Sequence, residues 1–152
     1  MSTVETIPPV VSATGAYVEK AGAYWYSSED VNVRELARAM NAVGARFVTI
    51  TAYQLPKDEG FRLEYHWDLE GRPLGFGFNL QGNSIESIYD LSEAVDWIER
   101  EIHEGFAIDF AGREYEPLLI RPGEPIGVNL RETGAPGKPA YGLPGVGEEV
   151  AK

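Results

Sequence analysis

The sequence of 152 residues has no cysteine, few basic residues and no long apolar run. Without cysteine the chain can form neither a disulfide nor a thiolate-ligated iron–sulfur cluster, so any such redox centre would belong to another protein. Its 13 Lys and Arg residues are outnumbered by 24 Asp and Glu, which gives a formal charge of −11. This charge argues against nucleic acid or an anionic membrane surface as a ligand and favours a neutral or basic protein partner.

A membrane-spanning helix needs about 18 consecutive apolar residues, and no stretch of the chain provides them. Residues 1–15 also lack the basic start and the apolar core of a secretory signal. We therefore expect a cytoplasmic chain with no direct membrane span.

Common catalytic and nucleotide-binding motifs are missing too. The chain has no Gly-x-Ser-x-Gly and no Walker motif, and Gly75-Phe76-Gly77 lacks the third glycine and the following helix of a dinucleotide fold. Glu99 and His103 lie one helical turn apart, as two ligands of a divalent metal can. His66 is the only other histidine, so further nitrogen ligands are scarce, and we interpret Glu99 and His103 as part of a solvated helix face. We predict no catalytic, cofactor-binding or metal-binding residue in this chain.

Composition divides the chain into three parts. Residues 1–15 contain Pro8-Pro9 and no apolar period, so we expect a flexible N-terminal arm. Residues 16–120 hold enough of the 43% apolar content to form one core. Residues 121–152 are rich in glycine and proline and are expected to form an extended tail, either disordered or laid over a neighbouring protein.

One helix and several strands follow from local patterns. Asn32 and Glu35 form a capping-box signature, and apolar residues at helical spacing continue to a Gly44 stop. These apolar residues are Val33, Leu36, Met40 and Val43. Strand composition or alternation occurs in residues 23–26, 46–53, 61–68, 74–80 and 84–89.

A second helix is predicted from Asp90, which forms another capping-box signature with Glu93, to a break at Gly105. Its apolar stripe consists of Leu91, Ala94, Val95, Ile98 and Ile102. Residues 106–110 and 118–120 are expected to be strands. The predicted fold is α+β, with an antiparallel sheet of about four to five strands, two main helices and the Gly/Pro-rich C-terminal tail.

The second helix carries the triplet Glu99-Arg100-Glu101 beside Trp97, whose position in the pattern resembles that of a buried residue. Arg100 can bind carboxylates with two parallel hydrogen bonds, and its acidic neighbours can attract a cation. Charge combined with apolar area, without a nucleophile, suits docking onto another protein. The competing interpretation is an ordinary surface ion pair worth about 0 to 1 kcal/mol.

The 26 residues from Ser87 to Gly112 resemble a known family signature. The pattern reads Ser87-Ile88-x-Asp90-Leu91-x-x-Ala94-x-Asp96-Trp97-x-Glu99-Arg100-Glu101-x-x-Glu104-x-Phe106-x-Ile108-x-Phe110-x-Gly112. It is similar to the C-subunit family of respiratory complex I, the NADH:quinone oxidoreductase, which also includes the related subunit of energy-converting membrane-bound NiFe hydrogenases such as formate hydrogenlyase.

This resemblance implies a non-catalytic structural subunit in a peripheral cytoplasmic arm, attached to the inner membrane through its complex. The implied partners are a large hydrogenase-like subunit and a small iron–sulfur subunit. Those partners would hold the iron–sulfur clusters, and in a hydrogenase the NiFe centre, for electron transport coupled to ion translocation. The residues expected to contact them are Trp97, Glu99, Arg100, Glu101, Glu104, Phe106 and Arg113.

Several positions depart from the family pattern. Gly105 replaces a bulky apolar residue, Ala107 a common glycine and Arg113 a usual histidine, and the chain beyond Pro125 lacks a basic His-Pro-Leu-Arg-Lys run. These departures favour the hydrogenase type over the quinone reductase. The alternative from another class is a freestanding small-molecule-binding or hydrolytic α+β protein.

Overall fold

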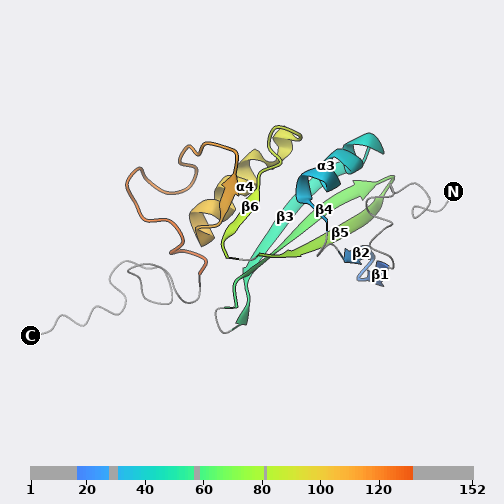
Figure 1. Ribbon diagram of the computed structural model, residues 1–152, viewed down its shortest axis with the longest axis horizontal. Helices are drawn as coiled ribbons and strands as arrows, with labels where there is room; N and C mark the ends of the chain where they lie inside the picture. The colour runs from blue at the N-terminus through green and yellow to red at the C-terminus, as the bar shows by residue number, and fades with distance from the viewer. Residues whose placement is uncertain (1–16, 28–30, 57–58, 81, 132–152) are drawn as a thin grey trace, which may run out of the picture.

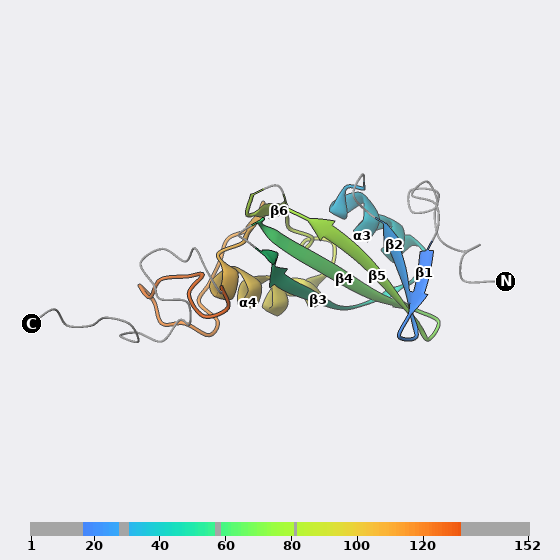
Figure 2. The ribbon, with the colours of Figure 1, turned by 90° about the horizontal axis from the view of Figure 1, so that it is seen from below.

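The computed structural model describes residues 17–27, 31–56, 59–80 and 82–131. A five-stranded sheet has the order β1-β2-β5-β4-β3. Its strands are β1 (Tyr17–Lys20), β2 (Ala23–Ser27), β3 (Arg46–Gln54), β4 (Phe61–Leu69) and β5 (Arg72–Asn79). Only the β2–β5 pair is parallel in this sheet. Helices α3 (Val33–Ala42) and α4 (Asp96–Phe106) lie on the same face of the sheet, and the view from below shows the strands in front of them (Figures 1 and 2).

The core lies between this face and the two helices. Strand β4 alternates strictly, so that Leu63, Tyr65 and Trp67 are buried on the helix side. Leu36 and Met40 of α3 are fully buried against the same core. The predicted α+β class, with a mostly antiparallel sheet and two helices, is confirmed.

Helix α3 follows its sequence signals closely. The Asn32 side chain accepts hydrogen bonds from the backbone N–H groups of Arg34 and Glu35, at 2.9 and 3.1 Å. Two free N–H groups of the first turn are thereby satisfied. Past the C-terminal end, Gly44 has φ 75°, a left-handed conformation that glycine adopts at little cost. The prediction of this helix is confirmed at both ends.

The predicted start of the second helix was wrong. Residues 93–95 form a short 3₁₀ turn, α4 begins only at Asp96, and no side chain caps it. Asp90 instead forms two hydrogen bonds with the guanidinium group of Arg34, at 2.6 and 2.7 Å. Its carboxylate therefore joins the start of α3 to the turn before α4, because a charged partner from another element outcompetes a local cap.

Three strand predictions also need correction. The segment 84–89 yields only β6 (Ser84–Glu86), which pairs in parallel with β7 (Asp109–Ala111) in a separate two-stranded sheet. The segment 106–110 contributes its first residue, Phe106, to α4 and only its last two residues to β7. Residues 118–120 are not a strand, since their backbone N–H groups bind a side chain of α4.

The expected arm at residues 1–15 lies outside the described residues, as does the tail beyond Arg131. Residues 121–131 are described, and they lie against the C-terminal end of α4 (Figure 1).

Candidate functional site

Residues 113–131, called the strap here, run beside α4 and bind it at every turn. Successive contacts on α4 involve Asp96, Arg100, Glu104 and the final carbonyl groups of the helix. The first three positions are four residues apart and therefore form one stripe along the helix. Helix α4, which carries residues 96–106 of the motif, and the strap together form one structural unit.

Arg113 begins the strap with a buried ion pair. Its side chain is only 6% exposed and donates to the fully buried Glu99 carboxylate at 2.9 Å. It also donates to the Asp96 carboxylate at 2.5 Å, and its guanidinium group lies over the rings of Tyr89 and Tyr115. The Arg113 hydrogen bond is the main reason that the pKa of Asp96 is lowered, and this carboxylate therefore stays ionised at neutral pH.

Glu99 is bound from a second direction. Its carboxylate accepts hydrogen bonds from the Ser87 hydroxyl at 2.7 Å and from the backbone N–H of Ile88 at 3.0 Å. Together with Arg113, these groups join the strap and the loop after β6 to α4 through the Glu99 carboxylate. The interpretation of Glu99 and His103 as a solvated helix face was thus wrong for Glu99, which is 0% exposed.

Arg100 fixes the strap at residues 116 and 117. Its guanidinium group donates to the Asp96 carboxylate at 3.0 Å and to the backbone carbonyl oxygens of Glu116 and Pro117, both at 3.1 Å. A planar guanidinium group suits this role because it can direct several N–H groups in fixed directions. The three contacts hold the strap at this turn of α4.

His103 and Tyr115 form a stacked pair, with ring centroids 3.6 Å apart and an interplanar angle of 8°. His103 Nδ1 lies 2.8 Å from the carbonyl oxygen of Ile108, which can only accept, so Nδ1 carries the proton. Burial raises the pKa of Tyr115 to about 12, and its hydroxyl binds the backbone of Phe110. Both side chains are therefore used in packing and backbone contacts.

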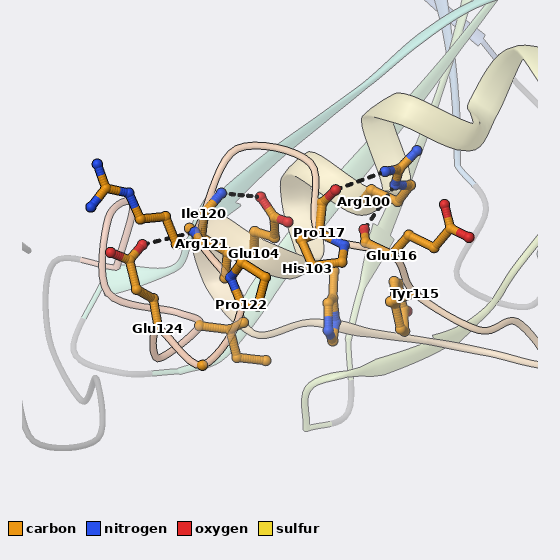
Figure 3. Close-up of a pocket in the computed structure, with 12 residues that line it drawn as sticks. Arg100, His103, Glu104, Tyr115, Glu116, Pro117, Ile120, Arg121, Pro122 and Glu124 are labelled. Carbon is orange, nitrogen blue, oxygen red and sulfur yellow. Dashed lines mark hydrogen bonds between the residues drawn. The ribbon is translucent and has the colours of Figure 1, made fainter.

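Glu104 holds the next part of the strap, residues 118–120. It is 5% exposed and accepts hydrogen bonds from the backbone N–H groups of Leu118, Leu119 and Ile120, at 2.6, 2.8 and 3.2 Å. Burial by itself raises the pKa of Glu104, but the three N–H groups outweigh it and the pKa lies below its usual value. Figure 3 shows Glu104 and Arg100 reaching the strap from successive turns of the helix.

The end of α4 is closed by the last residues of the strap. The backbone N–H of Leu130 donates to the Gly105 carbonyl, and Arg131 Nε donates to the Phe106 carbonyl. A Cβ on Gly105 would clash with the Leu130 side chain, so glycine makes this approach possible. Ala107 has φ 56°, a left-handed conformation that costs alanine about 1 to 2 kcal/mol.

Two small hollows lie beside the strap. One has a volume of about 130 Å³ and is lined by residues that include His103, Glu104 and Pro122 (Figure 3). The other has a volume of about 270 Å³ and is lined by residues that include Tyr89 and Glu114. Drug-sized ligands usually occupy pockets of about 300 to 1,000 Å³. Within the described part of the chain, no three His, Asp or Glu side chains form a group that could hold a metal ion.

Trp97 is 71% exposed, so the expectation that it is buried was wrong. Glu101 is exposed one turn further along α4. Leu119 of the strap is 70% exposed, although its backbone N–H is fixed by Glu104. The outer side of the unit thus presents apolar and acidic side chains.

Four of the seven predicted contact residues bind within this unit through their side chains, and two are exposed on its outer side. Glu99, Arg100, Glu104 and Arg113 bind within the chain, whereas Trp97 and Glu101 are exposed. Phe106 is the seventh, and its side chain is buried against Phe61. Contact of these residues with a partner subunit stays a prediction.

Sequence reasoning did not predict Ser87 and Tyr115 as internal partners, although Ser87 begins the family pattern, whereas Tyr115 lies outside it. It also missed Asp96, although the spacing of Asp96 and Arg100 is that of an ion pair on one helix face. That spacing and the place of Asp96 in the family pattern were the available signals. Among the described residues, no helix is long and apolar enough to cross a membrane.

Comparisons with a family model and with solved structures show what this chain is similar to. The family model of the respiratory-chain NADH dehydrogenase, 30 kDa subunit, matches residues 27–136. A chain in the structure of the membrane-bound sulfane sulfur reductase, an archaeal respiratory membrane complex, aligns with a TM-score of 0.61 and 20% identity over 72% of this chain and 71% of that chain. The trypsin-resistant fragment of Nqo5 aligns with a TM-score of 0.57 and 20% identity over 70% of this chain and 93% of that one. No curated protein matches the sequence.

Proposed function

The chain belongs to the family of the 30 kDa subunit of respiratory-chain NADH dehydrogenase, and it is therefore a subunit of a complex I-like membrane-bound respiratory complex; we propose that within this complex it is a non-catalytic structural subunit of the peripheral arm. It lies on the cytoplasmic side and joins a large hydrogenase-like subunit to a small iron–sulfur subunit. The iron–sulfur clusters belong to these partners. The subunit supports electron transfer coupled to ion translocation by keeping the partners in register.

One observation carries the proposal. Four charged residues of the family motif on α4, which are Asp96, Glu99, Arg100 and Glu104, use their hydrogen-bonding groups to hold the strap, with Arg100 and Glu104 binding five backbone groups between them. By binding the backbone of the strap, these side chains fix the shape of the surface that the strap and α4 present to other chains. This is the role expected of a subunit that works through contact with other chains.

The hydrogenase type is favoured over the quinone reductase. This choice rests on the sequence after Pro125, which has no basic His-Pro-Leu-Arg-Lys run. The likeness to a chain of the sulfane sulfur reductase, itself a respiratory membrane complex, is consistent with use of this fold in respiratory complexes of more than one type.

Affinity purification of the tagged chain from native membranes, with mass identification of its companions, tests the proposal. We expect a large hydrogenase-like subunit and a small iron–sulfur subunit, and a deletion strain should lose membrane-bound hydrogen evolution while quinone reduction by NADH continues. Recovery of the chain without companions would contradict the structural role. Loss of quinone reduction instead would reverse the choice of type.

The rival function is a freestanding small-molecule-binding or hydrolytic protein. It predicts that a ligand raises the melting temperature of the purified chain, whereas a structural subunit is stabilised by its partner subunits. The hollows of about 130 and 270 Å³ are smaller than typical ligand pockets and favour the structural role.

A further inference from the structure

The outer side of α4 and the strap carries two large apolar side chains with no cover from the described residues. Trp97 is 71% exposed and Leu119 is 70% exposed, the two highest values among the exposed large hydrophobic residues. Exposed tryptophan is costly to leave in water, and tryptophan is enriched among residues that dominate binding energy at interfaces. Both side chains therefore need an explanation beyond the fold of this chain.

Helix geometry relates the two positions. Trp97, Glu101 and Glu104 follow the i, i+4, i+7 spacing and lie on one face of α4. The helix rises about 1.5 Å per residue, so Trp97 and Glu104 are about 10 Å apart along the axis. Because Glu104 binds the backbone N–H of Leu119 at 2.8 Å, it fixes Leu119 near the far end of this face. Trp97 and the backbone of Leu119 are thus placed toward the two ends of this face of α4, and Glu101 is on the same face one turn after Trp97.

The charges on this outer side are acidic. Glu93, Glu101, Glu114 and Glu116 are exposed. Arg100 and Arg113 are turned inward, since their side chains are 13% and 6% exposed and are bound to carboxylates and backbone carbonyl groups. Arg121, two residues after Leu119, is exposed, but so is the nearby Glu124, and the acidic side chains outnumber this one cation. A partner surface that covers Trp97 must therefore meet negative charge around its rim.

We propose, on the basis of the structural function proposed above, that Trp97 and Leu119 insert into apolar pockets on a partner subunit whose rim carries Lys or Arg. Glu101 and Glu116 pair with those cations. Arg100, Arg113, Glu99 and Glu104 act within the chain by holding the strap, and they do not contact this partner directly. A second copy of the chain would bring acidic surfaces together, and an anionic membrane would be repelled in the same way.

The test uses tagged variants in a strain that lacks the native gene. Trp97→Ala and Leu119→Ala should each weaken retention of the subunit on the purified complex at least tenfold, because interface anchors commonly cost that much when truncated. Glu101→Lys should also weaken retention, and its effect should grow as the salt concentration is lowered, because repulsion between the new lysine and the cations of the partner is less screened at low salt. The matched controls are Val48→Ala on β3 and Glu70→Lys in the turn between β4 and β5, which should be retained like wild type.

A stability measurement separates binding from folding. The melting temperature of the Trp97→Ala chain should equal that of wild type, since its side chain is mostly solvated. If Trp97→Ala melts as early as Arg100→Ala, Trp97 supports the fold and the proposal is overturned.

Two further outcomes are distinct. If the wild-type chain is retained on the complex and the Trp97, Leu119 and Glu101 variants are retained equally well, the proposal fails while the structural function stands. If the wild-type chain itself is not retained, the proposed function fails.

Discussion

Replacement of Arg113 by methionine tests whether the buried ion pair holds the strap. Methionine keeps much of the apolar stem of arginine but removes the charge and all five N–H donors. The change would leave the Glu99 carboxylate, which is 0% exposed, with only the Ser87 hydroxyl and the Ile88 N–H as donors. It would also remove the ion pair from Asp96 at 2.5 Å.

The expected size of the effect follows from the burial of the pair. Two unit charges 2.9 Å apart attract each other by about 6 kcal/mol at an effective dielectric constant of about 20, but desolvation offsets part of this energy. Removing one member of a buried pair typically costs about 3 to 5 kcal/mol. We therefore expect Arg113→Met to lower the free energy of unfolding by at least about 3 kcal/mol, out of about 5 to 15 kcal/mol for a typical domain.

Urea unfolding of the purified chain, arranged as a double-mutant cycle with Glu99→Gln, provides the assay. The double variant should be more stable than Arg113→Met alone, because a neutral amide in place of the carboxylate removes the uncompensated buried charge. The matched control is Arg34→Met, whose partner Asp90 is 62% exposed, so that the loss should be much smaller. Additive effects of the two substitutions, within about 0.5 kcal/mol, would refute the reasoning.

Two further substitutions probe other contacts of the strap. Glu104→Gln should lower the free energy of unfolding by about 1.5 to 3 kcal/mol at pH 7, because the three N–H groups of residues 118–120 lose a charged acceptor. Those N–H groups, against the effect of burial, hold the pKa of Glu104 below its usual 4.5, so this contribution should be present above pH 4.5 and be lost as the pH falls through the lower folded-state pKa. A difference from wild type that does not shrink as the pH is lowered would argue against it. Ala107→Gly should raise the free energy of unfolding by about 1 kcal/mol, since glycine adopts φ 56° without the steric cost of alanine, and a lower melting temperature would show that the contact of the Ala107 methyl group matters more.

Local patterns predicted the parts of the fold that depend on local physics. Helix α3 begins at the Asn32 cap, and the alternation in residues 61–68 reports the buried face of β4. Both signals arise from residues close together in the sequence, so they are present before tertiary contacts form. The capping signature at Asp90 was misleading because Arg34, 56 residues away, binds the same carboxylate.

The residues of the site were predictable, but their roles were not. The family pattern and its departures named Glu99, Arg100, Glu104 and Arg113, and each of these binds a group 14 to 17 residues away in the chain. The apolar run at residues 118–120 looked like a strand because side chains give no sign that the backbone N–H groups bind a buried carboxylate. Trp97 was misjudged in the opposite direction. An aromatic residue in an amphipathic pattern suggests a buried position, but the Trp97 side chain lies outside the core.

The departures of this chain from the family pattern acquire a physical meaning once the strap is considered. Gly105 provides the room that the Leu130 side chain occupies, and Arg113 supplies a cation to the buried Glu99. Both departures therefore adapt α4 to its own strap and act on the inner side of the unit. A choice between hydrogenase and quinone-reductase partners must act on side chains that a partner can touch. Trp97 and Glu101 are exposed but belong to the pattern that both types share, whereas Leu119 is exposed and lies outside that pattern. Exchange of Leu119 should therefore change partner choice, while exchange of Gly105 or Arg113 should change stability.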